Sequence, residues 1–285
     1  MKLITWNAQW CRGVDGNVDP ARIVREAQAI ADFDVLCLQE IASNFPDPRL
    51  AGSRGENQFA EIGNRLPGFH GVGGAIVDVP DDQGGRRHFG NMILSRFSIG
   101  QVFRHLLPFP IDAGVNGMPR SALEAVIDAP GGSIRVITTH LEYYGTKQRA
   151  SQVEALRAIY AEGSGHARLG TIVDTTGGPF HTRPRPASTI ITGDFNLEPT
   201  DPLHARLTAP FEDGTPPLHD AWEVEHPGDP HAATFKIYEK ESPDEPEQHC
   251  DFIFVSADLA PRVKELRVDQ RTKASDHQPV FLELD

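Results

Sequence analysis

Residues 188–196 read STIITGDFN, a β-branched, apolar run that ends in Gly193, Asp194, Phe195 and Asn196. The run predicts a buried β-strand, and the polar residues behind it predict a turn at the strand end. Because residues two apart in an extended chain point to the same side, Asp194 and Asn196 are placed to face one phosphate together. An Asx-type turn between two elements explains the same residues, and this stretch alone favours neither interpretation.

The same arrangement of an apolar run and a polar end recurs along the chain. Strand ends are where a sheet presents residues that are distant in sequence to one ligand. The recurring groups are carboxylates, carboxamides and imidazoles, which suit a hard divalent cation and phosphate chemistry. Asn7 follows the run KLIT, Gln39 and Glu40 follow DVLCL, Thr139 and His140 follow IRVIT, and Ser275, Asp276 and His277 precede QPVFLEL.

Apolar and β-branched runs bounded by Gly, Pro, Asp or Asn predict strands along the whole chain. They are Leu3–Asn7, Val35–Gln39, Gly71–Val79, Met92–Ser95, Gly100–Leu107, Ala122–Ile127, Ile134–Thr139, Thr189–Thr192, Phe252–Val255, Val263–Val268 and Val280–Leu284. Helical spacing predicts helices at Pro20–Ala31, which Asp19 can cap, and at Asn57–Arg65 and Lys147–Ala161. The strands are too many for a simple doubly wound sheet. We therefore expect one domain over residues 1–285 with an α/β (α+β) fold, in which two mixed, mainly antiparallel sheets pack face to face with helices on both outer sides.

Composition and charge narrow the functional class. The 285-residue chain has a formal net charge of −13. A protein that grips a long polyanion usually carries a basic stripe, so this charge argues against extended binding of duplex nucleic acid. It does not exclude a phosphate substrate, because a metal ion and a few arginines can reverse the field locally.

Other compositional signals concern the compartment. No apolar run approaches the roughly 18–20 residues needed to cross a bilayer, and the N-terminal run lacks the pattern of a secretory signal. The three cysteines form no CxxC pair and support neither a disulfide framework nor a thiolate zinc site. Cys37 lies in an apolar run and is expected in the core. We expect a cytoplasmic protein without a transmembrane segment.

Candidate cation ligands and catalytic groups lie at the strand ends. Glu40 offers a carboxylate to a cation, although an isolated Leu-Gln-Glu is more often a loop or a helix start. His140 alone is more often a polar residue at a sheet end than a catalyst. Asp276 and His277 place a carboxylate ligand beside an ionisable imidazole. Asp251, at the start of DFIFVS, would orient His277 by accepting its ring N–H, and a turn residue is its plainer interpretation.

Two further residues offer hydrogen-bond donors to an anionic oxygen. Asn91 precedes the run MILSR and Arg120 precedes SALEAVI, so both are expected at strand beginnings. A salt bridge or a turn is the plainer explanation for each residue taken singly. Loop arginines could also approach an anionic substrate, although such residues are mostly solvated; they are Arg86, Arg87, Arg183 and Arg185.

Two stretches, Gly163–Pro186 and Pro227–Gln248, are rich in loop residues. The second is acidic and carries prolines, so we expect a solvated surface loop there. The histidines in and directly beside it are expected at the surface; they are His226, His231 and His249. The spacing of His226 and His231 does not make a zinc site without further ligands.

Taken together and in order, these motifs resemble the endonuclease/exonuclease/phosphatase superfamily, the metal-dependent phosphohydrolases related to exonuclease III and deoxyribonuclease I. Each motif is weak alone, and their order along the chain makes the resemblance specific. The resemblance implies a four-layer α/β sandwich with two central sheets and flanking helices. The motifs are TWNAQW, LCLQE, GNMILSRFSI, RSALEAVI, VITTHLE with a downstream RASQVEAL, ITGDFN, CDFIFVS and SDHQPV.

The resemblance also implies roles for the matched positions. Glu40 would ligate Mg²⁺, for which Mn²⁺ is a possible substitute, with Asn7 near the ion and Asp276 contributing. A phosphate-ester substrate is the implied partner. Tyr143 and Tyr144 are loose counterparts of a tyrosine that repair nucleases place between the histidine and aspartate motifs.

The implied catalytic residues surround the phosphate. Asp194 would activate or orient the attacking water, and Asn196 would position water and phosphate. His140 and His277, the latter oriented by Asp251, would stabilise the phosphoryl oxygens. Some members assign the base to the histidine near the C-terminus, so the sequence leaves open whether Asp194 or His277 takes the proton.

We therefore expect a magnesium-dependent phosphohydrolase that cleaves a phosphodiester or phosphomonoester by direct attack of water. The acidic charge and the lack of a long basic insertion favour a small phosphorylated molecule, a phospholipid head group or a short oligonucleotide as substrate. One alternative is a repair-type endonuclease or exonuclease that acts on duplex DNA. The other is a catalytically inactive binding or scaffolding module on the same fold.

Overall fold

The computed structural model describes residues 1–170, 172–240 and 242–285. In this part of the chain the strands are β1 (Lys2–Asn7), β2 (Val35–Ser43), β3 (His70–Pro80), β4 (Arg86–Ser95), β5 (Ile99–Leu106), β6 (Ser121–Ala129), β7 (Gly132–His140), β8 (Thr189–Asp194), β9 (Leu218–Asp220), β10 (Asp251–Ser256), β11 (Val263–Val268) and β12 (Val280–Leu284). The α-helices are α1 (Pro20–Ile30), α2 (Gln58–Asn64), α3 (Thr146–Leu169), α4 (Pro202–Thr208) and α5 (Ala221–Glu225).

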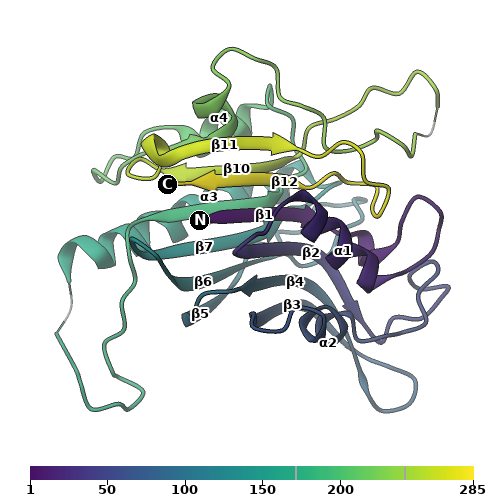
Figure 1. Ribbon diagram of the computed structural model, residues 1–285, viewed down its shortest axis with the longest axis horizontal. Coiled ribbons are helices and arrows are strands. Elements are labelled where there is room, and N and C mark those ends of the chain that lie inside the picture. The colour runs from purple at the N-terminus through teal and green to yellow at the C-terminus, as the bar shows by residue number, and fades with distance from the viewer. Residues whose placement is uncertain (171, 241) are drawn as a thin grey trace.

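The strands of the described residues form two six-stranded sheets (Figure 1). The first sheet has the order β11-β12-β1-β2-β4-β3, and the second has the order β5-β6-β7-β8-β10-β9. The pairs β1–β2 and β7–β8 are parallel, and the other neighbouring pairs are antiparallel. The sheets are thus mixed and mainly antiparallel, as the sequence predicts.

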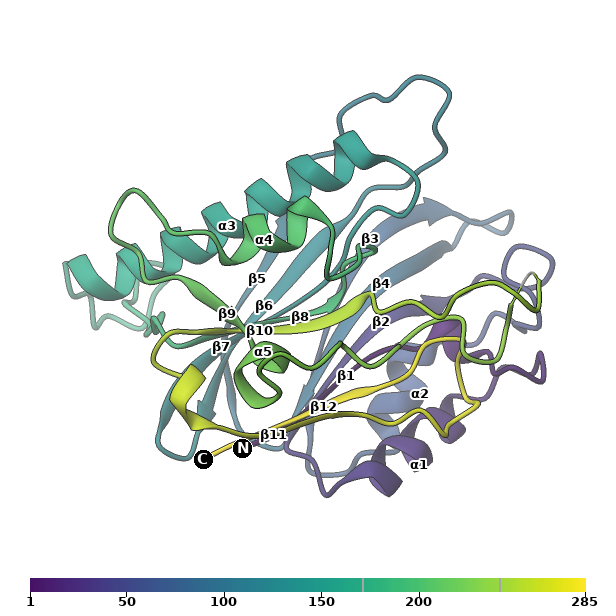
Figure 2. The same ribbon diagram turned by 90° about the horizontal axis from the view of Figure 1, so that it is seen from above.

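Helices cover the outer faces of both sheets. Helices α1 and α2 lie on the outer side of the first sheet, and α3 and α4 lie on the outer side of the second (Figure 2). Between the sheets, buried side chains such as Cys37 and Ile93 from the first sheet pack in one cluster with Leu123 and Val136 from the second. The expected four-layer sandwich is confirmed. None of the helices in the described ranges is long and apolar enough to cross a membrane.

Strand register gathers the polar strand ends. Parallel pairing of β1 with β2 sets Asn7 opposite the residue that precedes Glu40. Parallel pairing of β7 with β8 sets His140 opposite Asp194, and antiparallel pairing of β8 with β10 sets Asp194 opposite Asp251. Because the two sheets lie face to face, neighbouring strand ends of both sheets contribute residues to one site.

Some predicted boundaries are wrong. Strand β4 begins at Arg86, so Asn91 lies inside a strand and not at its beginning. The sequence does not predict β9, α4 or α5, because each is too short to show a clear apolar period. Both short helices begin at an aspartate cap instead: Asp201 accepts the N–H of Leu203, and Asp220 accepts the N–H of Trp222.

The loop prediction for Gly163–Pro186 is wrong in its first part, because α3 continues to Leu169. A Cβ atom at Gly163 would stand 1.7 Å from Nη1 of Arg135. Arg135 is fully buried, and its guanidinium donates to the carbonyl of Tyr160 at 3.2 Å in the preceding turn of α3. Glycine at this position therefore lets the helix pass over a buried arginine and does not mark a helix end.

A buried charge cluster joins β5, β6 and β7 to the segment that precedes β8. The fully buried Glu124 lies 2.8 Å from His105 Nε2 and accepts hydrogen bonds from Arg135 at 3.5 Å and from Arg185 at 3.1 and 3.2 Å. Burial alone would raise the pKa of Glu124. The hydrogen bonds from His105 and Arg185 and the charges of Arg135 and Arg185 outweigh burial and lower that pKa to about 2.

We expect Glu124→Gln to lower the free energy of unfolding at neutral pH by about 3–5 kcal/mol, because it leaves the fully buried Arg135 without a counter-charge, while Arg185 keeps Glu162. The folded pKa lies below the unfolded value of about 4.3. The stabilisation from Glu124 is therefore complete above the unfolded pKa and is lost as the pH falls toward the folded pKa. Urea unfolding over a pH series should give a flatter pH dependence for the variant in that acidic window. Parallel curves for the two proteins would contradict this account.

Candidate active site

Asp194 lies at the centre of the gathered strand ends, and its side chain is 1% exposed. Its Oδ2 accepts a hydrogen bond from Asn7 Nδ2 at 2.9 Å. The same oxygen lies 3.4 Å from His140 Nε2 and 3.7 Å from His277 Nε2. Its Oδ1 accepts the backbone N–H of Asn196 at 2.9 Å. One carboxylate thus contacts groups that both sheets supply.

The backbone after β8 fixes this carboxylate. Gly193 has φ 134°, and a Cβ atom there would stand 2.0 Å from the carbonyl oxygen of Thr139, so only glycine fits. Asn196 has φ 52° and donates from Nδ2 to the carbonyl of Leu141 at 2.9 Å. The bond from Asn196 N–H to Asp194 is an Asx turn, so the turn interpretation of GDFN holds in the same residues that form the site.

Glu40 and Asp276 supply two carboxylates beside β1. Glu40 has φ 59° at an irregularity of the β2–β4 pairing. Its Oε1 accepts from Asn7 Nδ2 at 3.2 Å and lies 3.7 Å from His140 Nδ1. Burial, followed by the charge of nearby Asp276, raises the pKa of Glu40 to about 7. Burial also raises the pKa of Asp276. Both side chains are half-buried, and both resist ionisation, as expected for acids partly withdrawn from water.

His277 is held on several sides. Its Nδ1 lies 2.9 Å from Asp251 Oδ2, and its ring stacks on Phe235 at 4.4 Å between centroids. Trp6 Nε1 donates to its backbone carbonyl at 2.9 Å. Burial lowers the pKa of His277, but the charges of Asp251 and Asp194 outweigh burial and raise it well above its ordinary value. A protonated imidazole therefore stands beside Asp194.

His140, unlike His277, is uncharged. Burial, together with the positive charges of Arg120 and His277, outweighs the attraction of Asp194 and lowers the pKa of His140 to about 3. At neutral pH His140 is an uncharged imidazole with one ring N–H. The two histidines that flank Asp194 therefore differ in charge, which the sequence alone does not indicate.

Arg120 and Asn91 lie next to this group. Arg120 Nε donates to Glu142 Oε2 at 3.4 Å, and both side chains are buried. Its Nη1 is buried and has no hydrogen-bond partner among the described residues. Asn91 Nδ2 donates to the carbonyl of Ser121 at 3.3 Å. Arg120 thus forms a salt bridge with Glu142, which the sequence suggests as the plainer explanation of this residue. Its Nη1 is left to donate to an anionic oxygen.

Three of the loop arginines that the sequence offers to a substrate are paired with carboxylates. Their positive charge is already compensated, so they are poor candidates for substrate contacts. Arg86 pairs with Asp78, Arg87 pairs with Asp82, and Arg185 pairs with Glu124 and Glu162.

A family model described as the Endonuclease/Exonuclease/phosphatase family matches residues 4–277. The chain belongs to this family. Members are phosphoric ester hydrolases, so both the resemblance and the enzyme class that the motifs predict are confirmed. A comparison with curated proteins gave no match.

Solved structures of endonuclease/exonuclease/phosphatase fold resemble this chain over its full length. An endonuclease/exonuclease/phosphatase from Beutenbergia cavernae DSM 12333 has a TM-score of 0.70 and 24% identity, with 99% of this chain and 70% of that chain covered. A mannosyl-6-phosphatase from Bacteroides thetaiotaomicron VPI-5482 has a TM-score of 0.63 and 20% identity, covering 100% and 99%. The 3′ phosphatase NExo from Neisseria, bound to a product DNA hairpin, has a TM-score of 0.61 and 20% identity, covering 100% and 99%. At these identities the likeness concerns the fold.

Family members generally depend on a divalent metal, and the donors of this site fit a hard divalent cation. Glu40 and Asp276 offer carboxylate oxygens, and burial is the first cause of the raised pKa of each. Gln9 Nε2 donates to Asp276 Oδ2 at 2.7 Å, while Gln9 Oε1 is buried without a partner among the described residues. A cation here would neutralise the acids and use this oxygen.

The sequence does not single out several residues that contact the site. Gln9 lies near the end of TWNAQW. Gln9, Trp10 and the following Cys11 all have positive φ, and this backbone turns the Gln9 side chain onto Asp276. Phe235 comes from the acidic loop and stacks on His277. No sequence pattern marks either contact, because both depend on how distant segments pack.

Cys250 and Glu142 also belong to the surroundings of the site. The thiol of Cys250 lies 3.6 Å from Asp251 Oδ2 and 3.9 Å from His277 Nδ1. Burial and the charge of Asp194 raise the pKa of this thiol well above its ordinary value, so it is not a reactive thiolate. Glu142 follows His140 by two residues in VITTHLE, and that spacing is the signal that could have found it.

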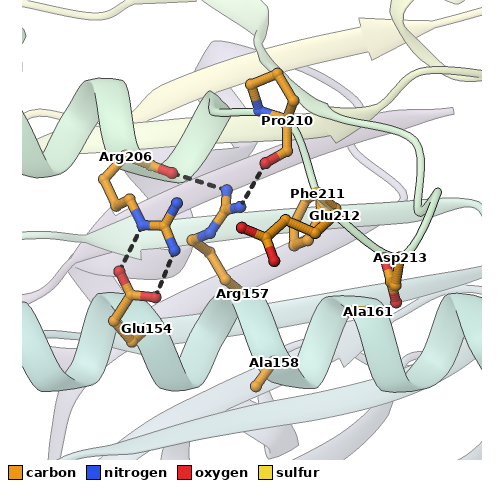
Figure 3. Close-up of a pocket in the computed structure, with 9 residues that line it drawn as sticks. All are labelled: Glu154, Arg157, Ala158, Ala161, Arg206, Pro210, Phe211, Glu212 and Asp213. Atoms are coloured by element: carbon orange, nitrogen blue, oxygen red, sulfur yellow. Dashed lines mark hydrogen bonds and ion pairs between the residues drawn. The ribbon is translucent and has the colours of Figure 1, made fainter.

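Two clefts differ in their relation to the site. One of about 130 Å³ adjoins Asn196 and is also lined by Tyr143, Phe235 and Cys250. Another, of about 420 Å³, lies between α3 and the end of α4 (Figure 3). In Figure 3 Arg206 pairs with Glu154, and Arg157 donates to backbone carbonyls at the end of α4. The charged side chains of this second cleft pair with each other or with backbone carbonyls, and these contacts hold α4 against α3.

Proposed function

We propose that this chain hydrolyses a small phosphate ester by direct attack of water, with Mg²⁺, or Mn²⁺ in its place, held by Glu40 and Asp276 beside Asn7. The observation that carries the proposal is the arrangement around Asp194. Its Oδ2 lies within 4 Å of His140 Nε2 and His277 Nε2 and is bonded to Asn7. These residues come from β1, β7, β8 and the segment before β12. We propose that residues 1–285 act as one catalytic domain.

The charge states divide the chemical roles. When bound, the metal would neutralise charge on the phosphoryl and leaving oxygens. His277 already holds its proton and therefore donates an N–H to a phosphoryl oxygen. Because His277 already carries its proton, the carboxylate of Asp194 is the group left to take a proton from the attacking water.

The remaining donors face the developing charge as well. Neutral His140 has one ring N–H to give, and the unpaired Nη1 of Arg120 supplies a further donor. Asn196, whose backbone is fixed by the Asx turn, positions the water and the phosphate. The buried thiol of Cys250 stays protonated, so the proposal involves no covalent intermediate.

Charge and shape favour a small substrate over duplex DNA. The net charge is −13, and the cleft beside Asn196 is only about 130 Å³. Tyr143 and Phe235 line this cleft and offer ring faces to a sugar or a head group. The similar structures include both a sugar phosphatase and a phosphatase that binds a DNA hairpin, so the fold itself does not select the substrate.

A substrate panel with Mg²⁺ tests this proposal. It contains a sugar phosphate, a phosphoinositide, a model phosphodiester, a short oligonucleotide, and a duplex with an abasic site. We expect kcat/KM for a small ester to exceed that for the duplex by at least about tenfold, or about 1.4 kcal/mol in transition-state binding. Preferred incision of the duplex would instead establish the repair-type nuclease, and a lack of turnover on every substrate would favour a binding module.

We expect Glu40→Gln to weaken Mg²⁺ binding by more than about 100-fold, the upper end of the loss seen when a residue that only orients a ligand is removed. The reason is that Gln keeps the shape of the side chain and removes the charge that the ion requires. Isothermal titration with Mg²⁺ measures the effect, with Glu61→Gln on the exposed side of α2 as the control. Equal affinities in wild type and Glu40→Gln would contradict the proposed metal site.

A further inference from the structure

A second cluster of metal-ligating side chains lies away from Asp194. His204 comes from α4, Asp220 ends β9, and His231 comes from the acidic loop. Asp220 Oδ2 lies 2.7 Å from His204 Nε2 and 2.9 Å from His231 Nε2, and one ligand atom from each residue lies within 4.8 Å of the others. The further ligands that the histidine spacing in the loop lacks thus come from outside the loop.

The cluster is separate from the active site. Asp220 pairs with Phe254 in β10, three residues along the strand from Asp251, which corresponds to about 10 Å. The cluster is also enclosed: His204 is 4% exposed and Asp220 is 2% exposed. The expectation that the histidines of this loop lie at the surface is therefore wrong for His249, which is 6% exposed and packs against Phe252.

The donor set differs in kind from that of the active site. Glu40 and Asp276 offer oxygen, whereas this cluster offers two imidazole nitrogens and one carboxylate, a set that suits Zn²⁺. Zinc–nitrogen distances of about 2.0–2.1 Å in a tetrahedron place neighbouring ligand atoms about 3.3 Å apart. The observed separations of 2.7 and 2.9 Å need to open by only about half an ångström to admit the ion.

Without a metal ion, hydrogen bonds from the two histidines to Asp220 hold the cluster together. The carboxylate oxygen of Asp220 only accepts, so both Nε2 atoms carry protons when they bond to it. Coordination by these nitrogens requires each proton to leave or to move to Nδ1 of the same ring. The other oxygen of Asp220 accepts the N–H of Trp222 at 2.8 Å and holds the carboxylate in place.

His249 lies next to the cluster but outside the group of ligand atoms that share a 4.8 Å limit, so its ring must shift inward to coordinate the same ion. Its ring lies 4.8 Å from that of His231, between centroids. Its Nδ1 bonds to the carbonyl of Ala232, which can only accept, so Nδ1 carries the proton and Nε2 is free of one. A ring N–H that donates to a backbone carbonyl is the usual support of a metal-binding histidine.

We propose that His204, Asp220 and His231 form a Zn²⁺ site, with His249 or a water molecule in the fourth position. The ion would fasten α4 and β9 to the loop that begins after α5. The same loop carries Phe235, which stacks on His277, so zinc would steady the support of this histidine. The role is structural, and the phosphoryl-transfer chemistry stays with the separate oxygen-lined site.

Zinc uptake by the full chain tests the proposal. Protein stripped with a chelator is dialysed against Zn²⁺ in excess Mg²⁺, which occupies the oxygen-lined site, and the bound metal is measured by mass spectrometry. We expect one zinc per chain in wild type and in Glu40→Gln. We expect a loss of that zinc in His204→Gln/His231→Gln, and its retention in the neighbouring His226→Gln control. In wild type, zinc at about 100 times its Kd should raise Tm by about 5 °C.

Several outcomes would overturn the proposal. Wild type that takes up no zinc would show that the cluster is only a hydrogen-bonded network. Zinc that is lost in Glu40→Gln and kept in the double histidine variant would lie in the active site instead. Co²⁺ gives an independent reading that does not require the double variant to fold, because wild type should show the intense visible absorption of a tetrahedral ion and a spectrum of octahedral type alone would refute the site.

Discussion

Asp194→Asn is expected to lower kcat by about 10³-fold or more, with the fold retained. The carboxylate accepts from Asn7 and Asn196 and stands between two imidazoles, so its replacement removes the group that takes the proton from water. Asn has nearly the same shape and can still accept one of these bonds, which preserves the turn after β8. The loss should therefore appear in kcat and leave KM and Tm nearly unchanged.

Single-turnover kinetics and thermal melting of Asp194→Asn check this expectation. Asp128→Asn is the matched control, because Asp128 is an exposed carboxylate on β6 that bonds to Ser133. The control should keep the activity of wild type. Activity of Asp194→Asn within about threefold of wild type, with an intact fold, would remove Asp194 from the chemical step.

His277→Gln and Asp251→Asn are each expected to lower kcat by about 10²–10⁴-fold, the range that follows loss of a catalytic histidine or of the acid that orients it. Asp251 holds the proton on Nδ1 of His277 and supports the positive charge that His277 brings to the phosphoryl oxygen. The two residues act as one unit, so the double variant should be little worse than the poorer single variant.

A double-mutant cycle on kcat measures this coupling, with His70→Gln as the control on an exposed histidine. Additive losses in the cycle would mean that Asp251 acts independently of His277. If Asp251→Glu keeps most of the kcat that Asp251→Asn loses, while no change at 251 restores kcat to His277→Gln, Asp251 is a positioning residue.

Much of the fold follows from alternating and β-branched patterns in the sequence. The strands Val263–Val268 and Val280–Leu284 have the predicted bounds, because turn residues flank them closely. The end of α3 was not predictable from local pattern. Gly163 reads as a helix breaker, and only the buried Arg135 beneath it explains why the helix continues.

The site was predictable where a polar residue ends an apolar run. His140 and Asp194 end their strands as that signal predicts, whereas Glu40 lies at an irregularity inside β2 and Asp276 precedes β12. Gln9 and Phe235 carry no such signal, because a left-handed turn places the first and a loop contact places the second. The cluster of His204, Asp220 and His231 was equally hidden, since its members come from three segments whose meeting depends on the packing of α4 and β9.

The central claim is that Glu40 and Asp276 hold one cation beside Asp194. An anomalous difference map from a crystal that contains Mn²⁺ in place of Mg²⁺ tests it most directly. We predict a peak about 2.0–2.3 Å from carboxylate oxygens of both Glu40 and Asp276, on the side that faces Asp194. A well-occupied Mn²⁺ site elsewhere, with no peak between Glu40 and Asp276, would contradict the account.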